Sequence, residues 1–197
     1  MNSENIYAAP DAELINIDAE TDTPLYFTVA RSKLLILSIF TLNLYSVYWF
    51  YKNWQLLKLN GNTDCMPVLR AIFQYFFTHS LFASIDETAV MQKIDRAWSS
   101  FLLATVYVVL LILGNIIGNF EGLTSQTTWY ITTTIGLVLV TPIPLYIVQK
   151  TVNEINGDPK GLENKSFTWL NWIALLLGLI LWAGFFLGIY GSSTAVG

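Results

Sequence analysis

Cysteine and histidine are almost absent from the chain, which has one of each, Cys65 and His79. A single cysteine excludes a disulfide within the chain and suits a protein that faces the cytoplasm or lies within a membrane. A metal site needs several histidine, cysteine or carboxylate ligands that converge on one point, and one histidine with one distant cysteine cannot supply them. We therefore expect no metal site.

Motifs for nucleotide binding and catalysis are also missing. The chain contains no G-x-G-x-x-G, no phosphate-binding P-loop and no G-x-S-x-G, the patterns that commonly mark dinucleotide, phosphate and hydrolase sites. Its longest apolar stretches contain no aspartate or glutamate that could act as a catalytic acid within a membrane. We therefore expect a protein that is not an enzyme and that carries no cofactor.

Charge is scarce and unevenly distributed. Charged residues make up 12% of the 197 residues, whereas a soluble domain has about a quarter. Residues 1–30 contain acids and no base, which is unsuited to binding nucleic acid. This segment also lacks the basic start and apolar core of a secretory signal peptide, so we expect no cleaved signal.

Long stretches without any charged residue fill much of the remaining chain, at 97–120, 122–149 and 166–197. A helix of about 20 apolar residues crosses a hydrocarbon core of about 30 Å. The stretches predict membrane-spanning helices over about 98–118, 128–149 and 167–190. The predicted fold class is all-α, a multi-pass helical membrane protein whose partner is the lipid bilayer.

Two shorter apolar segments, 34–51 and 67–85, could span the membrane, re-enter it or lie at its surface. Aromatic residues gather in the second half of 34–51, as at a membrane–water interface, and Thr41 could cap a second helix there. This favours a helix, a break and a second helix. The charge-free part of the other segment, 71–85, is short for a span.

The chain divides into a disordered acidic cytoplasmic tail over 1–30 and a helical membrane domain over 31–197. Lysines and arginines flank the predicted spans on one side, in 86–97 and 150–166, and are absent from the links on the other side. Because basic residues stay on the cytoplasmic side, we expect a cytoplasmic N-terminus and a periplasmic C-terminus. If both shorter segments turn back, every lysine and arginine lies on the cytoplasmic side. If both span, Lys52 and Lys58 lie on the periplasmic side.

A few polar or unusual residues within the apolar regions are candidate functional residues. His79, Asp86 and Asn115 could form a polar or pH-sensing site, although His79 could equally anchor a surface helix at the headgroups. Pro142 and Pro144 remove two backbone donors and predict a helix break after Thr141.

Two small-residue pairs, Gly114/Gly118 and Gly184/Gly188, have the G-x-x-x-G spacing that lets helices approach closely. They could pack helices within the chain or join two copies into a homo-oligomer.

Three motifs carry a resemblance to known proteins. The opening Asn5-Ile6-Tyr7-Ala8-Ala9-Pro10 resembles the N-P-Y-x-A-P-x-A start of many small bacterial inner-membrane proteins. The runs K-L-L-I-L-S-x-x-T-x-x-L-Y-x-x-Y-W-F-Y-K-N-W over 33–54, A-I-F-x-x-F-F-T-H-S-L-F over 71–82 and D-P-K-G…F-T-W-L-N-W over 158–172 are similar to a family of uncharacterised multi-pass bacterial membrane proteins. The resemblance implies a location in the bacterial inner membrane and brings no known activity.

The leading functional hypothesis is a non-enzymatic inner-membrane interaction or adaptor protein. Its short N-terminal motif (Asn5, Tyr7, Ala8, Ala9 and Pro10) would bind a cytoplasmic protein partner, because a disordered segment can order itself on binding. One alternative is a transporter or channel subunit with a helix broken by proline. Another is a membrane-shaping protein that uses the aromatic region 45–54 as a wedge.

Overall fold

The computed structural model describes residues 23–119 and 127–195, and every regular element in these ranges is a helix. The helices are α1 (Arg31–Phe40), α2 (Tyr45–Leu59), α3 (Pro67–Ile72), α4 (Gln74–Met91), α5 (Ser100–Asn119), α7 (Thr127–Val140), α8 (Ile143–Ile155) and α9 (Trp169–Ala195). The all-α class predicted from the sequence is confirmed.

Three stretches are long and apolar enough to cross a bilayer: Ser100–Gly118, Thr128–Ile155 and Trp169–Gly191. Only 17%, 33% and 6% of their most apolar windows are buried inside the protein, respectively. Apolar helices that leave so much surface uncovered require lipid as their solvent. The three predicted spans are thus present as helices of membrane-crossing length and composition.

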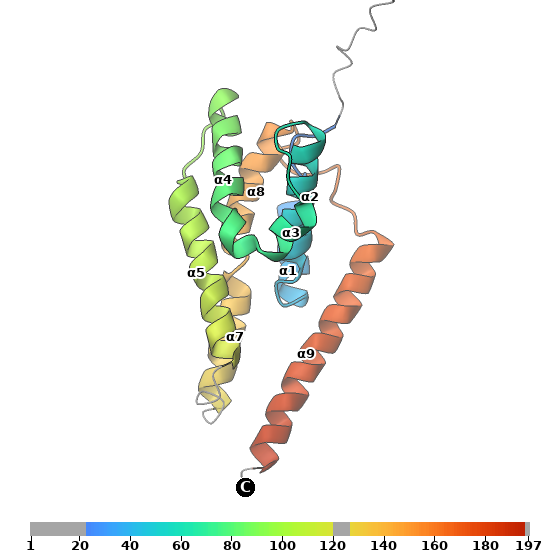
Figure 1. Cartoon of the computed structure of the whole chain (residues 1–197). Coiled ribbons are helices and arrows are strands. Elements are labelled where there is room, and N and C mark those ends of the chain that lie inside the picture. The colour runs from blue at the N-terminus through green and yellow to red at the C-terminus, as the bar shows by residue number, and fades with distance from the viewer. Residues whose placement is uncertain (1–22, 120–126, 196–197) are drawn as a thin grey trace, which may run out of the picture.

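Helices α1–α4 and α8 pack with the extended segment 24–30 into a bundle that we call the head (Figure 1). Helices α5, α7 and α9 project from the head in a common direction (Figure 1). Helix α5 packs along α4, α7 and α8, whereas α9 packs against α1. The head core contains large aromatic side chains that are almost fully buried, among them Trp49, Trp54, Phe50 and Phe82.

A tight turn separates α1 from α2. Leu42 and Asn43 have φ angles of 50° and 67°, in the left-handed region that asparagine tolerates better than leucine. Thr41 stabilises the turn because its Oγ1 accepts a hydrogen bond from Tyr45 N (3.0 Å) and donates one to Leu37 O (2.7 Å). The helix, break and second helix expected around Thr41 are present in the structure.

Helix α2 reverses the direction of the chain. Asn60 Nδ2, just after α2, donates to Pro24 O (3.2 Å), and two helical turns earlier Asn53 Oδ1 accepts from Phe27 N (3.1 Å). Residues 24–27 therefore run antiparallel to α2, and the chain enters and leaves this hairpin at one end, which we call the outer end of the head.

Segment 67–85 also turns back. Gln74, at the start of α4, accepts a hydrogen bond from Ser46 Oγ (3.3 Å) far from the outer end, whereas Thr88 Oγ1 lies 2.9 Å from Tyr26 OH near that end. Helix α4 therefore returns the chain to the outer end. Within the described ranges, neither short apolar segment supplies a candidate span, so both match the alternative in which they turn back or lie at the surface.

The second candidate span is broken at Pro142, and its second half, α8, packs in the head. Helix α7 ends at Val140, and Pro142 is the N-cap of α8, with Pro144 in the first turn. Thr141 N and Oγ1 both donate to Leu137 O (2.9 and 2.7 Å), and Tyr146 N donates to Pro142 O (2.9 Å). The two prolines thus sit where a helix starts and their missing N–H groups cost least.

Helix α9 approaches the backbone of the head closely at Gly178. Gly178 packs so tightly against the backbone at Phe40 and Thr41 that a Cβ there would overlap the Phe40 carbonyl, and Trp182 Nε1 donates to Ile39 O (3.3 Å). In contrast, a Cβ at each glycine of the two G-x-x-x-G pairs would meet nothing within 4 Å. Within the part of the chain that the structure describes, those pairs therefore do not bring helices together, which leaves the option of contact between copies.

We predict that Gly178→Val forces α9 away from α1, because the added side chain overlaps backbone that cannot move independently. The free energy of unfolding should fall by about 1–3 kcal/mol, measured as a lower Tm of the detergent-solubilised protein. Gly184→Val is the matched control on the same helix, since its Cβ would lie in open space. Equal Tm values for the two variants would contradict the contact.

Candidate functional site

Residues 24–30 form an extended strand-like segment buried between helices of the head. Tyr26, Val29 and Ala30 are 1%, 0% and 4% exposed, so their backbone groups need partners inside the protein. No neighbouring β-strand supplies them in the described part of the chain. The acidic sequence predicts a disordered tail as far as residue 30, whereas residues 24–30 are part of the head.

Side-chain amides replace the missing β-strand. Asn156 Oδ1 accepts from Leu25 N (3.1 Å) and Tyr26 N (3.3 Å), and its Nδ2 donates to Tyr26 O (2.6 Å). Asn153 bonds both Val29 N (3.3 Å) and Val29 O (3.0 Å). Each amide thus pairs with the backbone through a donor and an acceptor at once, as a neighbouring strand would.

The set of amides, which we call the amide clasp, comes from both sides of the segment. Its members are Asn53 on α2 together with Gln149, Asn153 and Asn156 on or next to α8. Gln149 Nε2 donates to Phe27 O (3.0 Å) and to Asn153 Oδ1 (2.7 Å), which links the clasp along α8. The spacing 149, 153, 156 puts three amides on one helical face.

Sequence reasoning missed the clasp although a signal was present. Three uncharged amides recur at helical spacing directly after the apolar stretch that ends the second span. Such residues are costly to bury without partners, so their periodicity indicates a polar partner. The partner itself could not be identified, because it lies more than 120 residues away in the sequence.

A cleft of about 670 Å³ opens at the outer end of the head beside the buried segment. Its lining combines apolar groups with hydroxyls and two opposite charges: Leu25, Tyr26, Trp54, Leu57, Asn62, Thr63, Arg70, Ser80, Ser84, Glu87, Thr88, Met91 and Gln92. The size is that of a small-molecule site. Its mixed lining suits binding of a ligand with both polar and apolar parts.

Arg70 is the principal cation of this cleft. Its guanidinium lies 4.3 Å from the ring centroid of Trp54 and 5.2 Å from that of Phe77, which is cation–π geometry. No carboxylate pairs with Arg70 among the residues that the structure describes. Tyr26 also lines the cleft, and burial raises the pKa of its hydroxyl, which stays protonated at neutral pH.

His79 and Asp86, two of the predicted site residues, both lie where α4 meets α5. His79 Nε2 is 3.1 Å from Thr105 Oγ1, whereas Asp86 pairs with Arg96 Nε and accepts from Ser100 Oγ (3.0 Å). They are two helical turns apart, and each has its own partners. Their described contacts are those of helix packing and an ion pair, and the pH-sensing role stays a prediction.

Asn115, the third member of that predicted site, lies farther along α5. It follows Thr105 by ten residues, which corresponds to about 15 Å of helix, so the structure does not bring it to His79 or Asp86. Among the described residues, no group of three or more histidine, cysteine or acidic side chains could hold a metal ion.

The N-terminal motif lies outside the described residues. Asn5, Tyr7, Ala8, Ala9 and Pro10 precede residue 23, where the description begins. The structure shows only where the chain that follows the motif enters the head, at residues 24–30.

Comparison with protein-family models gives no match for the chain. Comparisons with curated proteins and with solved structures give no match either. Function has therefore to be argued from the residues and contacts of this chain.

We predict that Asn153→Ala releases the buried segment, because Val29 N and O would both lose their partner in an apolar core. The free energy of unfolding should fall by about 2–4 kcal/mol, and limited proteolysis should cut more readily within 24–30. Asn62→Ala, at an exposed position, is the matched control. An Asn153→Ala protein as stable and as protease-resistant as the control would show that the clasp contributes little.

Proposed function

We propose that this protein is a non-enzymatic integral protein of a bacterial inner membrane that presents its acidic N-terminal tail to a cytoplasmic protein partner. The observation that carries the proposal is the amide clasp. It ties residues 25–29 to α2 and α8 through a series of hydrogen bonds. Whatever binds the tail is thereby held at a fixed point on the membrane domain.

The distribution of bases supports a cytoplasmic outer end. Every lysine and arginine lies on the head or on the links 92–99 and 156–168, and none lies in 97–149 or 166–197. With both short segments turned back, no base is left on the other side. This satisfies the tendency of basic residues to stay in the cytoplasm better than two additional spans would.

The resemblance of the N-terminal motif and of the body motifs supports the bacterial inner membrane as the location. The motif residues Tyr7 to Pro10 are followed by a polar, acidic stretch up to residue 22. A short patterned element joined by a polar segment to a rigid anchor is an arrangement suited to docking, because the element can order on its partner without disturbing the anchor.

A transporter or channel subunit is the second candidate, favoured by a cavity between the α1–α2 turn and helices α5 and α7. The cavity has a volume of about 200 Å³, and Asn43 and Thr134 are part of its lining. Their side-chain oxygens, Asn43 Oδ1 and Thr134 Oγ1, are buried and have no hydrogen-bond partner among the described residues. Ion or solute flux through reconstituted protein that falls in Asn43→Leu would favour this candidate over the adaptor.

A homo-oligomer is compatible with either function. A Cβ at Gly184 or Gly188 would meet no described atom within 4 Å, so this small-residue pair on α9 is available to a second copy in the bilayer. Gly114 instead lines the cavity between the α1–α2 turn, α5 and α7.

The proposed orientation predicts the labelling of single cysteines. In a Cys65→Ser background, Asn62→Cys and Lys160→Cys should react with an impermeant maleimide only after the cytoplasmic side is opened. Thr124→Cys should react from the periplasmic side of intact cells. Labelling of position 62 in intact cells would contradict the turned-back arrangement of segment 34–51.

The adaptor proposal predicts that deletion of residues 1–12 removes one or more proteins that copurify with the full chain after cross-linking in the membrane. Deletion of residues 13–22 is the matched control, because it removes a similar length and leaves the motif intact. Retention of all partners after the first deletion would count against the adaptor. Equal loss in both deletions would mean that the length or charge of the tail matters and the motif does not.

A further inference from the structure

Lys33 is a buried cation without a buried anion. Its residue is 3% exposed, and its Nζ donates to Asn164 Oδ1 (2.7 Å) and Ser166 O (2.8 Å). Neither acceptor carries a charge, and no carboxylate pairs with Lys33 in the described part of the chain. An uncompensated buried ammonium costs on the order of several kcal/mol. A negatively charged partner would therefore stabilise this site strongly.

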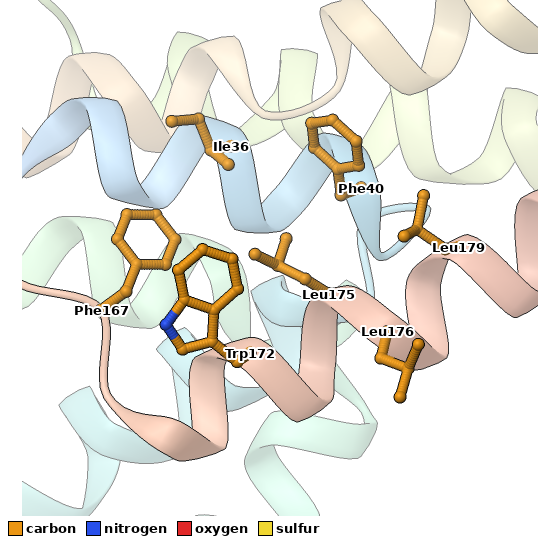
Figure 2. Close-up of a pocket in the computed structure, with 7 residues that line it drawn as sticks. All are labelled: Ile36, Phe40, Phe167, Trp172, Leu175, Leu176 and Leu179. Atoms are coloured by element: carbon orange, nitrogen blue, oxygen red, sulfur yellow. The ribbon is translucent and has the colours of Figure 1, made fainter.

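An apolar cavity lies between α1 and α9, and one residue of its lining, Phe167, neighbours Lys33. Its volume is about 460 Å³, and its lining is entirely hydrophobic: Ile36, Phe40, Phe167, Trp172, Leu175, Leu176 and Leu179. Figure 2 shows Ile36 and Phe40 on α1 facing the side chains of α9, with the Phe167 and Trp172 rings next to each other at one end. Lys33 lies one turn before Ile36 on α1, and its Nζ is 5.8 Å from the centroid of Phe167.

The surroundings of the cavity indicate what fills it. Helix α9 is a candidate span of which 6% of the most apolar window is buried, so the cavity opens toward the hydrocarbon of the bilayer. Trp169 and Trp172, both exposed at the start of α9, mark the membrane–water interface. The Lys33 end of the cavity is therefore at the level of lipid headgroups, and the other end lies among acyl chains.

We propose that an anionic phospholipid binds between α1 and α9, with one acyl chain in the cavity and its phosphate at Lys33. The two features that carry this assignment match the two parts of such a lipid. The apolar lining takes the chain, and the third N–H of the Lys33 ammonium, which neither acceptor uses, donates to the phosphate. Because only neutral oxygens accept from the Lys33 ammonium, a lipid with a net negative charge is favoured over a zwitterionic one.

The experiment uses the full chain purified in a mild detergent and stripped of lipid. An equimolar mixture of phosphatidylglycerol and phosphatidylcholine is added, and native mass spectrometry counts each lipid bound per chain. Both lipids carry the phosphate that accepts from Lys33, but only phosphatidylglycerol has a net negative charge to compensate the ammonium. We therefore expect one phosphatidylglycerol to be retained with a preference of about tenfold over phosphatidylcholine. Equal retention of both lipids would overturn the proposal.

Lys33→Met keeps the length of the side chain and removes its charge, so it should bring the two lipids to nearly equal retention. Lys58→Met is its matched control, because Lys58 is exposed and pairs at the surface with Asp64 (3.9 Å), away from the cavity. A preference in Lys33→Met as strong as in the control would overturn the assignment of the headgroup.

A second pair of variants tests the cavity if Lys33→Met does not fold. Leu179→Trp fills one end of the cavity and leaves Lys33 intact, and it should abolish the bound lipid. Leu187→Trp makes the same change on the exposed surface of α9, outside this lining, and should retain the lipid. Unchanged retention in Leu179→Trp, or displacement of the lipid by glycerol phosphate, which has no acyl chain, would overturn the proposal.

Discussion

The backbone of residues 24–30 has to be satisfied inside a helical protein, and the rest of the head depends on how this is done. The segment lies between α2 and α8 with Val29 fully buried, so each unpaired N–H or C=O would cost free energy. Amides from both helices meet that demand. Because Asn53 and Asn153 form hydrogen bonds with neighbouring parts of one segment, the segment joins two helices that are 100 residues apart in the chain.

Apolar side chains are covered by protein in the core of the head and are left open along α9. In the head, aromatic side chains such as Trp49 and Phe50 are wholly enclosed, as in a water-soluble core. In the spans, large apolar side chains remain open to the outside, as at Leu176 and Leu187, which are 60% and 69% exposed. Lipid makes that exposure favourable, and α9 contacts α1 at Gly178 and through the Trp182 hydrogen bond to Ile39 O.

Buried polarity in this protein is mostly uncharged. The clasp and the contact of Gln74 with Ser46 and Tyr107 OH (3.3 and 3.0 Å) use amides and hydroxyls that pair with one another or with backbone. Neutral groups are cheaper to enclose than ions. Lys33 departs from this pattern, because its charge is enclosed at the junction of α1 with the start of α9 and only neutral oxygens accept its hydrogen bonds.

The sequence by itself determined the all-α class, the three spans and the break at Pro142. These follow from local physics: charge-free stretches of membrane-crossing length partition into lipid whatever their neighbours are, and proline removes a donor wherever it stands. The tail motif and the polar candidates His79, Asp86 and Asn115 also follow from local sequence patterns. Their spacing in the sequence does not show that Asn115 lies far from the other two.

Only the tertiary structure decided that segments 34–51 and 67–85 turn back and that residues 24–30 belong to the head. Both outcomes depend on partners distant in sequence, such as Asn153 for Val29 at a separation of 124 residues and Gln74 for Ser46. A marginal apolar length is compatible with crossing or returning, and packing selects between them. An amide in a sequence shows that a partner is needed, whereas the fold alone brings that partner within hydrogen-bonding distance.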